Sequence, residues 1–321
     1  NSIIKFRIRS FRNSKKSNLI EQTKETISKY ASIDKLSFVV LDLLRDDGWD
    51  QAVNGCKYIM HIASPFPMKV SSNRNILLPV AVDGTLRVLK ACLNADVKQI
   101  IVTSSIVAMF RKPNRSNPYS FGENDWTDEN WIEGVSDYFL SKTIAEKAAW
   151  DFMESKGMKN KLTTINPGGV FGDALDKKGG TSIEYIRQFL KGKFPAAPKF
   201  AVLISDVMDV AKSHIACIDN KNVGGRRLIV GKDVKKLVEL SQIMAEAMPE
   251  YAKKLPKKEL PNFMVKLISY IDSSAKTMIP DLGIIMQTDT TYAEELLGFK
   301  FKPAKDCIIE NAKSVVKLGL V

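Results

Sequence analysis

Short apolar runs rich in β-branched residues alternate with longer amphipathic segments along the first half of the chain. The apolar runs have the continuous hydrophobic character of strands buried on both faces, and they cover residues 35–43, 56–64, 98–105 and 161–167. Between them, helical spacing of apolar residues predicts helices over 15–29, 46–53, 77–94 and 138–155. An earlier stretch, Ile4 to Ile8, alternates apolar and basic residues and predicts a further strand.

This alternation of strand and helix predicts an α/β fold with a doubly wound parallel sheet. After about residue 166 the pattern becomes irregular, with Gly and Pro in NPGGVFGDALDKKGG and FPAAPK. A helix is expected from Val207, a strand in RRLIVG, and further helices to the end. Such a tail is typical of a smaller lobe that lies over one edge of the sheet.

The composition is that of a folded globular chain, since 45% of its 321 residues are hydrophobic and 26% are charged. No apolar stretch approaches the roughly 18 residues of a membrane-spanning helix, and the start NSIIKFRIRSFRNSKK lacks the apolar centre of a secretory signal. We therefore expect a cytoplasmic protein with no membrane partner.

Cysteine and histidine offer little material for a metal site. The cysteines stand far apart, at positions 56, 92, 217 and 307. They form no C-x-x-C pair, so we expect buried free thiols in a reducing compartment. The chain has only two histidines, His61 and His214, which is little material for a histidine metal site or a Ser-His-Asp triad.

The charge is basic, with 48 Lys and Arg against 36 Asp and Glu and a formal net charge of +12. Such a balance raises the question of a polyanionic partner. The basic residues are scattered, without aromatic interleaving, so we expect a solvated surface and no nucleic-acid partner. Residues 1–20 are the exception, because they hold six basic residues and no acidic one: Lys5, Arg7, Arg9, Arg12, Lys15 and Lys16.

The segment DYFLSKTIAEKAAW places Tyr138 and Lys142 four residues apart on a predicted helix, hence on one face. The pKa of a tyrosine is about 10, and it must fall by roughly three units for the phenol to exchange protons near neutral pH. A fixed ammonium in a dry pocket can supply that stabilisation. The same spacing is common on exposed helices, which is the alternative interpretation.

Hydroxyl groups end the strand IIVTSS, at Thr103, Ser104 and Ser105. In an open parallel sheet, ligands bind in the crevice outside the carboxyl ends of the strands. We expect Ser105 to hydrogen-bond a substrate carbonyl there. For Thr103 and Ser104 the favoured interpretation is that they close the strand with local backbone bonds.

Eight segments match, in order from about residue 6 to the C-terminus, the motifs of a known enzyme family. They are LDLLRDDGWDQAVNGCKYIMHIASPF, LLPVAVDGTLRVLKAC, IIVTSSIVA, ENDWTD, DYFLSKTIAEKAAW, INPGGVFG, SDVMDVAKSHIA and YAEELLGFKFKP. In these segments the chain resembles the extended short-chain dehydrogenases/reductases of the NAD-dependent epimerase/dehydratase superfamily. Within them it is similar to the dihydroflavonol reductase-like or aldehyde reductase-like branch, which has a Rossmann-type fold.

The resemblance implies a catalytic role for three residues. Tyr138 matches the family's proton donor to the carbonyl oxygen, Lys142 the lysine that lowers the phenol pKa and holds the nicotinamide ribose, and Ser105 the serine that orients the carbonyl. The implied reaction is hydride transfer from a reduced nicotinamide to a small-molecule aldehyde or ketone. Such an enzyme is expected to be a monomer or a homodimer.

Further cofactor contacts are implied at the strand ends and the loops that follow them. Besides Tyr138 and Lys142, they are Asp42, Leu43, Ala63, Ser64, Pro65, Thr103, Pro167 and Val170. An acidic residue after the strand IIKFRIRSF would favour NAD, whereas a basic one suits the extra phosphate of NADP. Because this strand ends in Arg12, with Lys16 shortly after, we predict NADP(H) with these two residues at the phosphate.

The same resemblance divides the chain into two parts. We expect an NADP-binding domain of residues 1–166 to which 200–232 returns, and a substrate lobe formed mainly by 167–199 and 233–321. The family's first strand and its Gly-x-x-Gly-x-x-Gly loop, expected just before residue 1, are absent from the sequence. We therefore expect a chain that lacks its first strand and loop unit.

Two alternatives remain beside the reductase. One is a nucleotide-sugar epimerase or dehydratase on the same fold, although A-S-P-F and N-P-G-x-V-x-G resemble the reductase branch more. The other is a homologue that binds cofactor, or has lost it, without turnover. The joint presence of Ser105, Tyr138 and Lys142 argues against loss of the catalytic centre.

Overall fold

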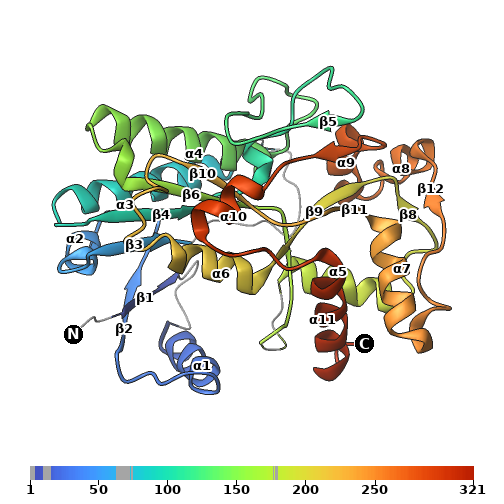
Figure 1. Ribbon diagram of the computed structural model, residues 1–321, viewed down its shortest axis with the longest axis horizontal. Coiled ribbons are helices and arrows are strands. Elements are labelled where there is room, and N and C mark those ends of the chain that lie inside the picture. Colours follow the sequence, from blue (N-terminus) through green and yellow to red (C-terminus); the bar gives the residue numbers. More distant parts are fainter. Residues whose placement is uncertain (1–3, 10–15, 63–72, 74, 176, 178–179) are drawn as a thin grey trace.

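A parallel sheet of four strands forms the centre of the molecule, in the order β10-β6-β4-β3 (Figure 1). The computed structural model describes residues 4–9, 16–62, 73, 75–175, 177 and 180–321, with the backbone alone for 4–9, 16–19, 273 and 274. The four strands are β3 (Tyr58–His61), β4 (Gln99–Thr103), β6 (Leu162–Pro167) and β10 (Arg227–Val230). The predicted α/β class is confirmed.

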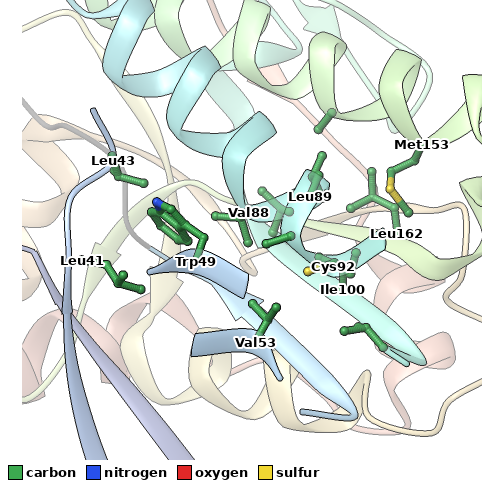
Figure 2. Close-up of a cluster of buried hydrophobic side chains, with 14 of the residues drawn as sticks. Leu41, Leu43, Trp49, Val53, Val88, Leu89, Cys92, Ile100, Met153 and Leu162 are labelled. Atoms are coloured by element: carbon green, nitrogen blue, oxygen red, sulfur yellow. The ribbon is translucent and has the colours of Figure 1, made fainter. Parts of the chain in front are cut away.

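Helices cover both faces of this sheet, because its strands carry apolar side chains on both sides. On β4, Ile100 joins a core with three helices that are consecutive along the chain (Figure 2), and Val102 joins the same core. Ile101 joins a second core, on the opposite face of the sheet. The first face is covered by α2 (Trp49–Val53), α3 (Gly84–Leu93) and α4 (Asp137–Ser155). The other is covered by α6 (Val207–Ala216) and α10 (Thr291–Leu297).

The helix predicted over 77–94 begins differently from expectation. A π-helical turn occupies Pro79–Asp83 and the regular helix α3 starts at Gly84. A Cβ atom on Gly84 would lie 2.9 Å from the Cβ of Leu43, so a side chain there would collide with the segment after β2. The glycine thus permits the close approach of α3 to a strand end.

A separate parallel pair is formed by β1 (Ile4–Arg9) and β2 (Leu36–Leu41), linked by α1 (Lys16–Ser28). Their positions agree with the alternating and apolar patterns of the sequence. Among the described residues, neither strand pairs with the central sheet. The single sheet that the sequence predicts is therefore divided here into a pair and a group of four.

The C-terminal part builds a second layer with its own core. Strand β7 (Gly169–Phe171) pairs in parallel with β9 (Ala201–Asp206), which pairs antiparallel with β11 (Val234–Lys236). The helices of this part are α5 (Thr181–Leu190), α7 (Leu237–Ala247), α8 (Asn262–Ile268), α9 (Ser273–Met278) and α11 (Ala304–Lys317). Helices α5, α7 and α11 bury a cluster that includes Phe189, Leu240 and Ile308.

Two very short parallel bridges tie distant segments together. Strand β8 (Ala197–Pro198) pairs with β12 (Glu259–Leu260), and β5 (Tyr119–Ser120) pairs with β13 (Met286–Gln287). The second bridge joins the loop after β4 to the C-terminal part.

The remaining sequence expectations concern thiols and membranes. Cys92, Cys217 and Cys307 are buried and Cys56 is half-buried, and all four are free. Within the described parts of the chain, none of the helices combines the length and the apolar character that crossing a bilayer requires.

Candidate active site

Helix α4 brings the predicted catalytic pair to the carboxyl end of the central sheet. Tyr138 is its second residue and Lys142 follows one turn later. The side of α4 that faces the protein is unusually polar for a buried helix face, since Ser141, Lys142 and Glu146 are all buried. Buried polar groups persist only where partners satisfy them or where they serve chemistry.

Ser105 lies directly after β4, in extended backbone conformation, and is buried. Its hydroxyl accepts a hydrogen bond from the N–H of Val107 at 3.3 Å and lies 3.4 Å from the carbonyl oxygen of Pro167 at the end of β6. It also forms a hydrogen bond with the phenol of Tyr138. Two of the three predicted catalytic groups are therefore in direct contact.

The ammonium of Lys142 reaches the end of β4 from the next turn of α4. Among the described residues its one hydrogen bond goes to the carbonyl oxygen of Thr103, at 3.4 Å. Burial lowers the pKa of Lys142 to about 8, and the charge of Glu146 opposes that change. Lys142 and Glu146 also line a small cavity of about 20 Å³, which has room for one water molecule.

The pKa of Tyr138 differs from the sequence prediction. Burial raises the pKa of Tyr138 to about 12, and the hydrogen bond from Ser105 opposes this only in part. The sequence argument expected Lys142 to lower the pKa. In this structure the ammonium is directed to the strand end at Thr103, and desolvation of the half-buried phenol dominates. The phenol is accordingly a protonated group, ready to donate.

Thr103 and Ser104 do not close the strand with local backbone bonds, contrary to the interpretation favoured above. The Thr103 hydroxyl lies 2.7 Å from Nε2 of His214, and the Ser104 hydroxyl donates to the carboxylate of Glu146. His214 Nδ1 is 2.7 Å from the carbonyl oxygen of Val210, and burial lowers the pKa of this histidine. His214 is thus a packed, neutral residue.

Several of the predicted cofactor contacts lie at or just after the ends of strands. Asp42 follows β2, is half-buried, and accepts the N–H of Leu44 at 3.0 Å. Leu43 is buried in the core shown in Figure 2. Its carbonyl oxygen accepts a hydrogen bond from Nη1 of Arg87 at 2.6 Å. Pro167 ends β6 and Val170 lies in β7.

The other predicted cofactor contacts cannot be placed in this way. Arg12, Ala63, Ser64 and Pro65 lie outside the described residues. Lys16 opens α1, and its side chain is not among those described. Their roles stay predictions from the sequence.

Residues that the sequence argument passed over complete the site. Glu146 is buried one turn beyond Lys142, and Asn166 donates from β6 to the carbonyl oxygen of Ser105 at 3.2 Å. Arg227, from β10, donates its Nε to Glu146 at 2.7 Å. The spacing of Lys142 and Glu146 on one helix face was a visible signal. The partners of Glu146 from β6 and β10, Asn166 and Arg227, had no such signal in the sequence.

Comparison with known proteins agrees with this geometry. The model of the 3-beta hydroxysteroid dehydrogenase/isomerase family matches residues 5–222. Cinnamoyl-CoA reductase 1 of Petunia hybrida is 28% identical over 287 residues, which are 89% of this chain and 78% of that protein. The NADPH-dependent methylglyoxal reductase GRE2 of Saccharomyces cerevisiae is 30% identical over 302 residues, 87% of this chain and 83% of that protein.

The fold comparison points in the same direction. The structure of yeast methylglyoxal/isovaleraldehyde reductase Gre2 complexed with NADPH aligns with a TM-score of 0.76 and 25% identity, over 96% of this chain and 91% of that one. The resemblance to the short-chain dehydrogenases/reductases predicted from the sequence is confirmed. This chain belongs to the 3-beta hydroxysteroid dehydrogenase/isomerase family.

Proposed function

We propose that this protein is an NADPH-dependent reductase of a small aldehyde or ketone. The observation that carries the proposal is the convergence of Ser105, Tyr138 and Lys142 at the carboxyl end of the central sheet, with Ser105 hydrogen-bonded to Tyr138. A protonated phenol beside a second hydroxyl is the arrangement needed to receive a carbonyl oxygen.

Each of the three residues then has a distinct task. When bound, the reduced nicotinamide supplies the hydrogen and the electron pair for the carbonyl carbon. Ser105 and Tyr138 both donate hydrogen bonds to the carbonyl oxygen, and Tyr138 gives up its proton as that oxygen becomes an alcohol. The charge of Lys142 stabilises the phenolate that remains. The buried surroundings strengthen these interactions because water does not screen them.

The donor set fits a cofactor that carries hydroxyl groups. Lys142 has three N–H donors, and within the described residues it makes a single long hydrogen bond, so it can hold a ribose hydroxyl. Five further residues would hold other parts of the cofactor. Thr103 and Pro167 end the neighbouring strands β4 and β6, Asp42 and Leu43 follow β2, and Val170 lies in β7. Arg12 and Lys16 favour NADP over NAD, and a larger kcat/KM with NADPH than with NADH checks this choice.

The expected division of the chain is part of the proposal. Residues 1–166 with 200–232 would bind the cofactor, and 167–199 and 233–321 would mainly bind substrate. Separate cores in the two parts support it, as does the return of β10 to the central sheet beside β6. A cytoplasmic location and a monomeric or homodimeric state remain predictions from the sequence.

The alternatives are less well supported. The relatives named above are reductases of thioesters or carbonyl compounds, by their names, whereas a nucleotide-sugar epimerase or dehydratase would return its cofactor unchanged after each turnover. A protein that binds cofactor without turnover has no need of a buried lysine next to a tyrosine and a serine.

Replacement of one oxygen atom tests the proposal. Tyr138→Phe removes the proton donor and should lower kcat for NADPH oxidation with small aldehydes or ketones by about a hundredfold or more. Tyr185→Phe is the matched control, because Tyr185 packs against Phe189 and Phe194 in the other core and should change kcat little. Equal turnover by the Tyr138→Phe and wild-type proteins would refute the mechanism.

A further inference from the structure

Glu146 is a buried carboxylate that the proposed mechanism has not yet used. It is 2% exposed and stands one turn beyond Lys142 on α4. Among the described residues, five side chains place donors on it: Ser104 Oγ, Asn166 Nδ2 at 2.8 Å, Arg227 Nε at 2.7 Å, Thr164 Oγ1 at 3.0 Å and Trp150 Nε1 at 3.3 Å. These donors occupy the acceptor sites of both carboxylate oxygens, as a buried charge requires.

Two of these donors lie on either side of Ser105. Ser104 precedes it in the chain, and the amide of Asn166 donates both to Glu146 and to the carbonyl oxygen of Ser105. The carboxylate therefore holds the end of β4 against β6 at the residue that contacts Tyr138. A displacement of this turn would move the Ser105 hydroxyl.

The same carboxylate faces Lys142 across the small cavity. Both side chains line it, together with His61 from β3 and Thr85 from α3. His61 is bonded to Thr85 at 3.3 Å, and Arg227 from β10 contacts the far side of Glu146 while its guanidinium stacks 3.6 Å from the ring of Trp126. Among the described residues, the charged or titratable groups of this region are Lys142, Glu146, His61, Arg227 and Tyr138, together with His214, which is bonded to Thr103.

Glu146 keeps its charge in this environment. Burial by itself would raise its pKa, but the charge of Arg227 and the hydrogen bonds from Arg227, Ser104 and Asn166 outweigh it and lower the pKa. A permanent negative charge so near Lys142 favours the ammonium over the neutral amine.

We propose that Glu146 is a positioning residue of the reductase site: its carboxylate fixes the turn that presents Ser105 and places a negative charge behind the Lys142 ammonium. The inference rests on the proposed function, because a positioning role presupposes the reductase reaction. The effect of the carboxylate on the charge of Lys142 is measurable without substrate or cofactor.

A titration of Lys142 tests it. In protein with isotopically labelled lysine side chains, NMR gives the pKa of Lys142, whose signal is the one missing from Lys142→Met. Glu146→Gln keeps the shape and removes the charge, so the pKa of Lys142 should fall by about one unit. An unchanged pKa of Lys142 in Glu146→Gln would overturn the proposal.

Glu294→Gln is the matched control. Glu294 is equally buried, on α10, and accepts from Lys232 at 2.7 Å, Lys300 at 3.0 Å and the N–H of Phe301 at 2.9 Å. Glu294 lies against the other face of the sheet, so the loss of its charge should leave the pKa of Lys142 unchanged. Glu146→Asp retains the charge and should keep most of the wild-type pKa.

Two further measurements distinguish an effect of the substitution on folding from an effect on function. If Glu146→Gln does not fold because Arg227 is left unpaired, the titration is made in Glu146→Gln/Arg227→Met, with Arg227→Met alone as its reference. For activity, the alkaline limb of the kcat profile should move with the pKa, giving about a fivefold lower kcat at pH 8. A wild-type protein without reductase activity would refute the proposed function, while the titration still decides the role of Glu146.

Discussion

Lys142 is held in the folded protein at a cost in stability. Burial lowers its pKa from 10.5 to about 8, so the folded state binds this proton less tightly than the unfolded chain does. The difference amounts to roughly 3 kcal/mol at most. The destabilisation is present in full below about pH 8 and disappears as the pH rises towards 10.5, where the unfolded chain also loses the proton.

Lys142→Met should therefore be more stable than the wild type and inactive as a reductase. The substitution keeps a long unbranched side chain and removes the buried charge, for a gain of about 1–3 kcal/mol at pH 7 that shrinks by pH 10. Urea unfolding at the two pH values measures it. Lys147→Met, on the same helix but paired with Glu129 at the surface, should change stability by less than about 1 kcal/mol. A loss of stability at pH 7 in Lys142→Met would contradict the account.

The residues of the site were only partly predictable from the sequence. The i, i+4 spacing of Tyr138 and Lys142 and the place of Ser105 at a strand end are local signals, and the structure brings the three together. The destinations of the Thr103 and Ser104 hydroxyls are tertiary, because His214 and Glu146 arrive from helices far along the chain. A short polar side chain does not reveal such a partner.

At the scale of elements, a buried ion cluster connects the loop after β4 to the segment before β13. Asp281 is 1% exposed and bridges Arg111 and Arg115, the latter at 2.7 Å. Arg111 also donates to the carbonyl oxygens of Gly134 at 2.9 Å and Thr277 at 2.8 Å. One carboxylate thus balances two buried guanidinium groups beside the segment that leads to Tyr138.

Asp281→Asn should be strongly destabilising, because it leaves both arginines buried without a counter-charge. We expect a loss of about 3–5 kcal/mol in the free energy of unfolding. Asp46→Asn, which breaks the exposed pair with Arg87, should cost less than about 1 kcal/mol. Urea unfolding of the two variants compares them, and similar losses would show that the buried cluster is not what joins these elements.

The elements themselves followed from the sequence to the extent that their signals are local. Strands β4 and β6 lie within the apolar runs because a strand buried on both faces must be apolar throughout. The bridges β5–β13 and β8–β12 had no such signal, since each consists of two residues that pair with a segment far away in the chain. The start of α3 depends on the contact of Gly84 with Leu43, which is also tertiary.

For the whole molecule, the site lies where the central sheet meets the C-terminal layer. At Gly168 the two approach so closely that a Cβ atom would lie 2.2 Å from the carbonyl oxygen of Leu203. This contact fixes the β6–β7 turn, which carries Pro167 opposite Ser105. The fold class and part of the site could thus be predicted from the sequence, whereas the packing that joins the two layers required the structure.

The formal net charge is +12, but lysines of the C-terminal part pair with carboxylates. Lys232 and Lys300 both pair with Glu294, and Lys302 pairs with Asp206 at 3.2 Å and Glu310 at 2.6 Å. The pKa of Lys302 is raised because these two carboxylates outweigh its partial burial. The three lysines and three carboxylates of this group balance one another, so the group adds nothing to the net charge of the chain.

The central claim is that this chain reduces a carbonyl carbon with NADPH. The most direct test is the mass of the alcohol formed from a small aldehyde when both hydrogens at the reactive carbon of the NADPH nicotinamide ring are replaced by deuterium. The account predicts one deuterium per alcohol with the wild-type protein and almost no alcohol with Tyr138→Phe. An alcohol without label, or labelled alcohol in equal yield from both proteins, would contradict it.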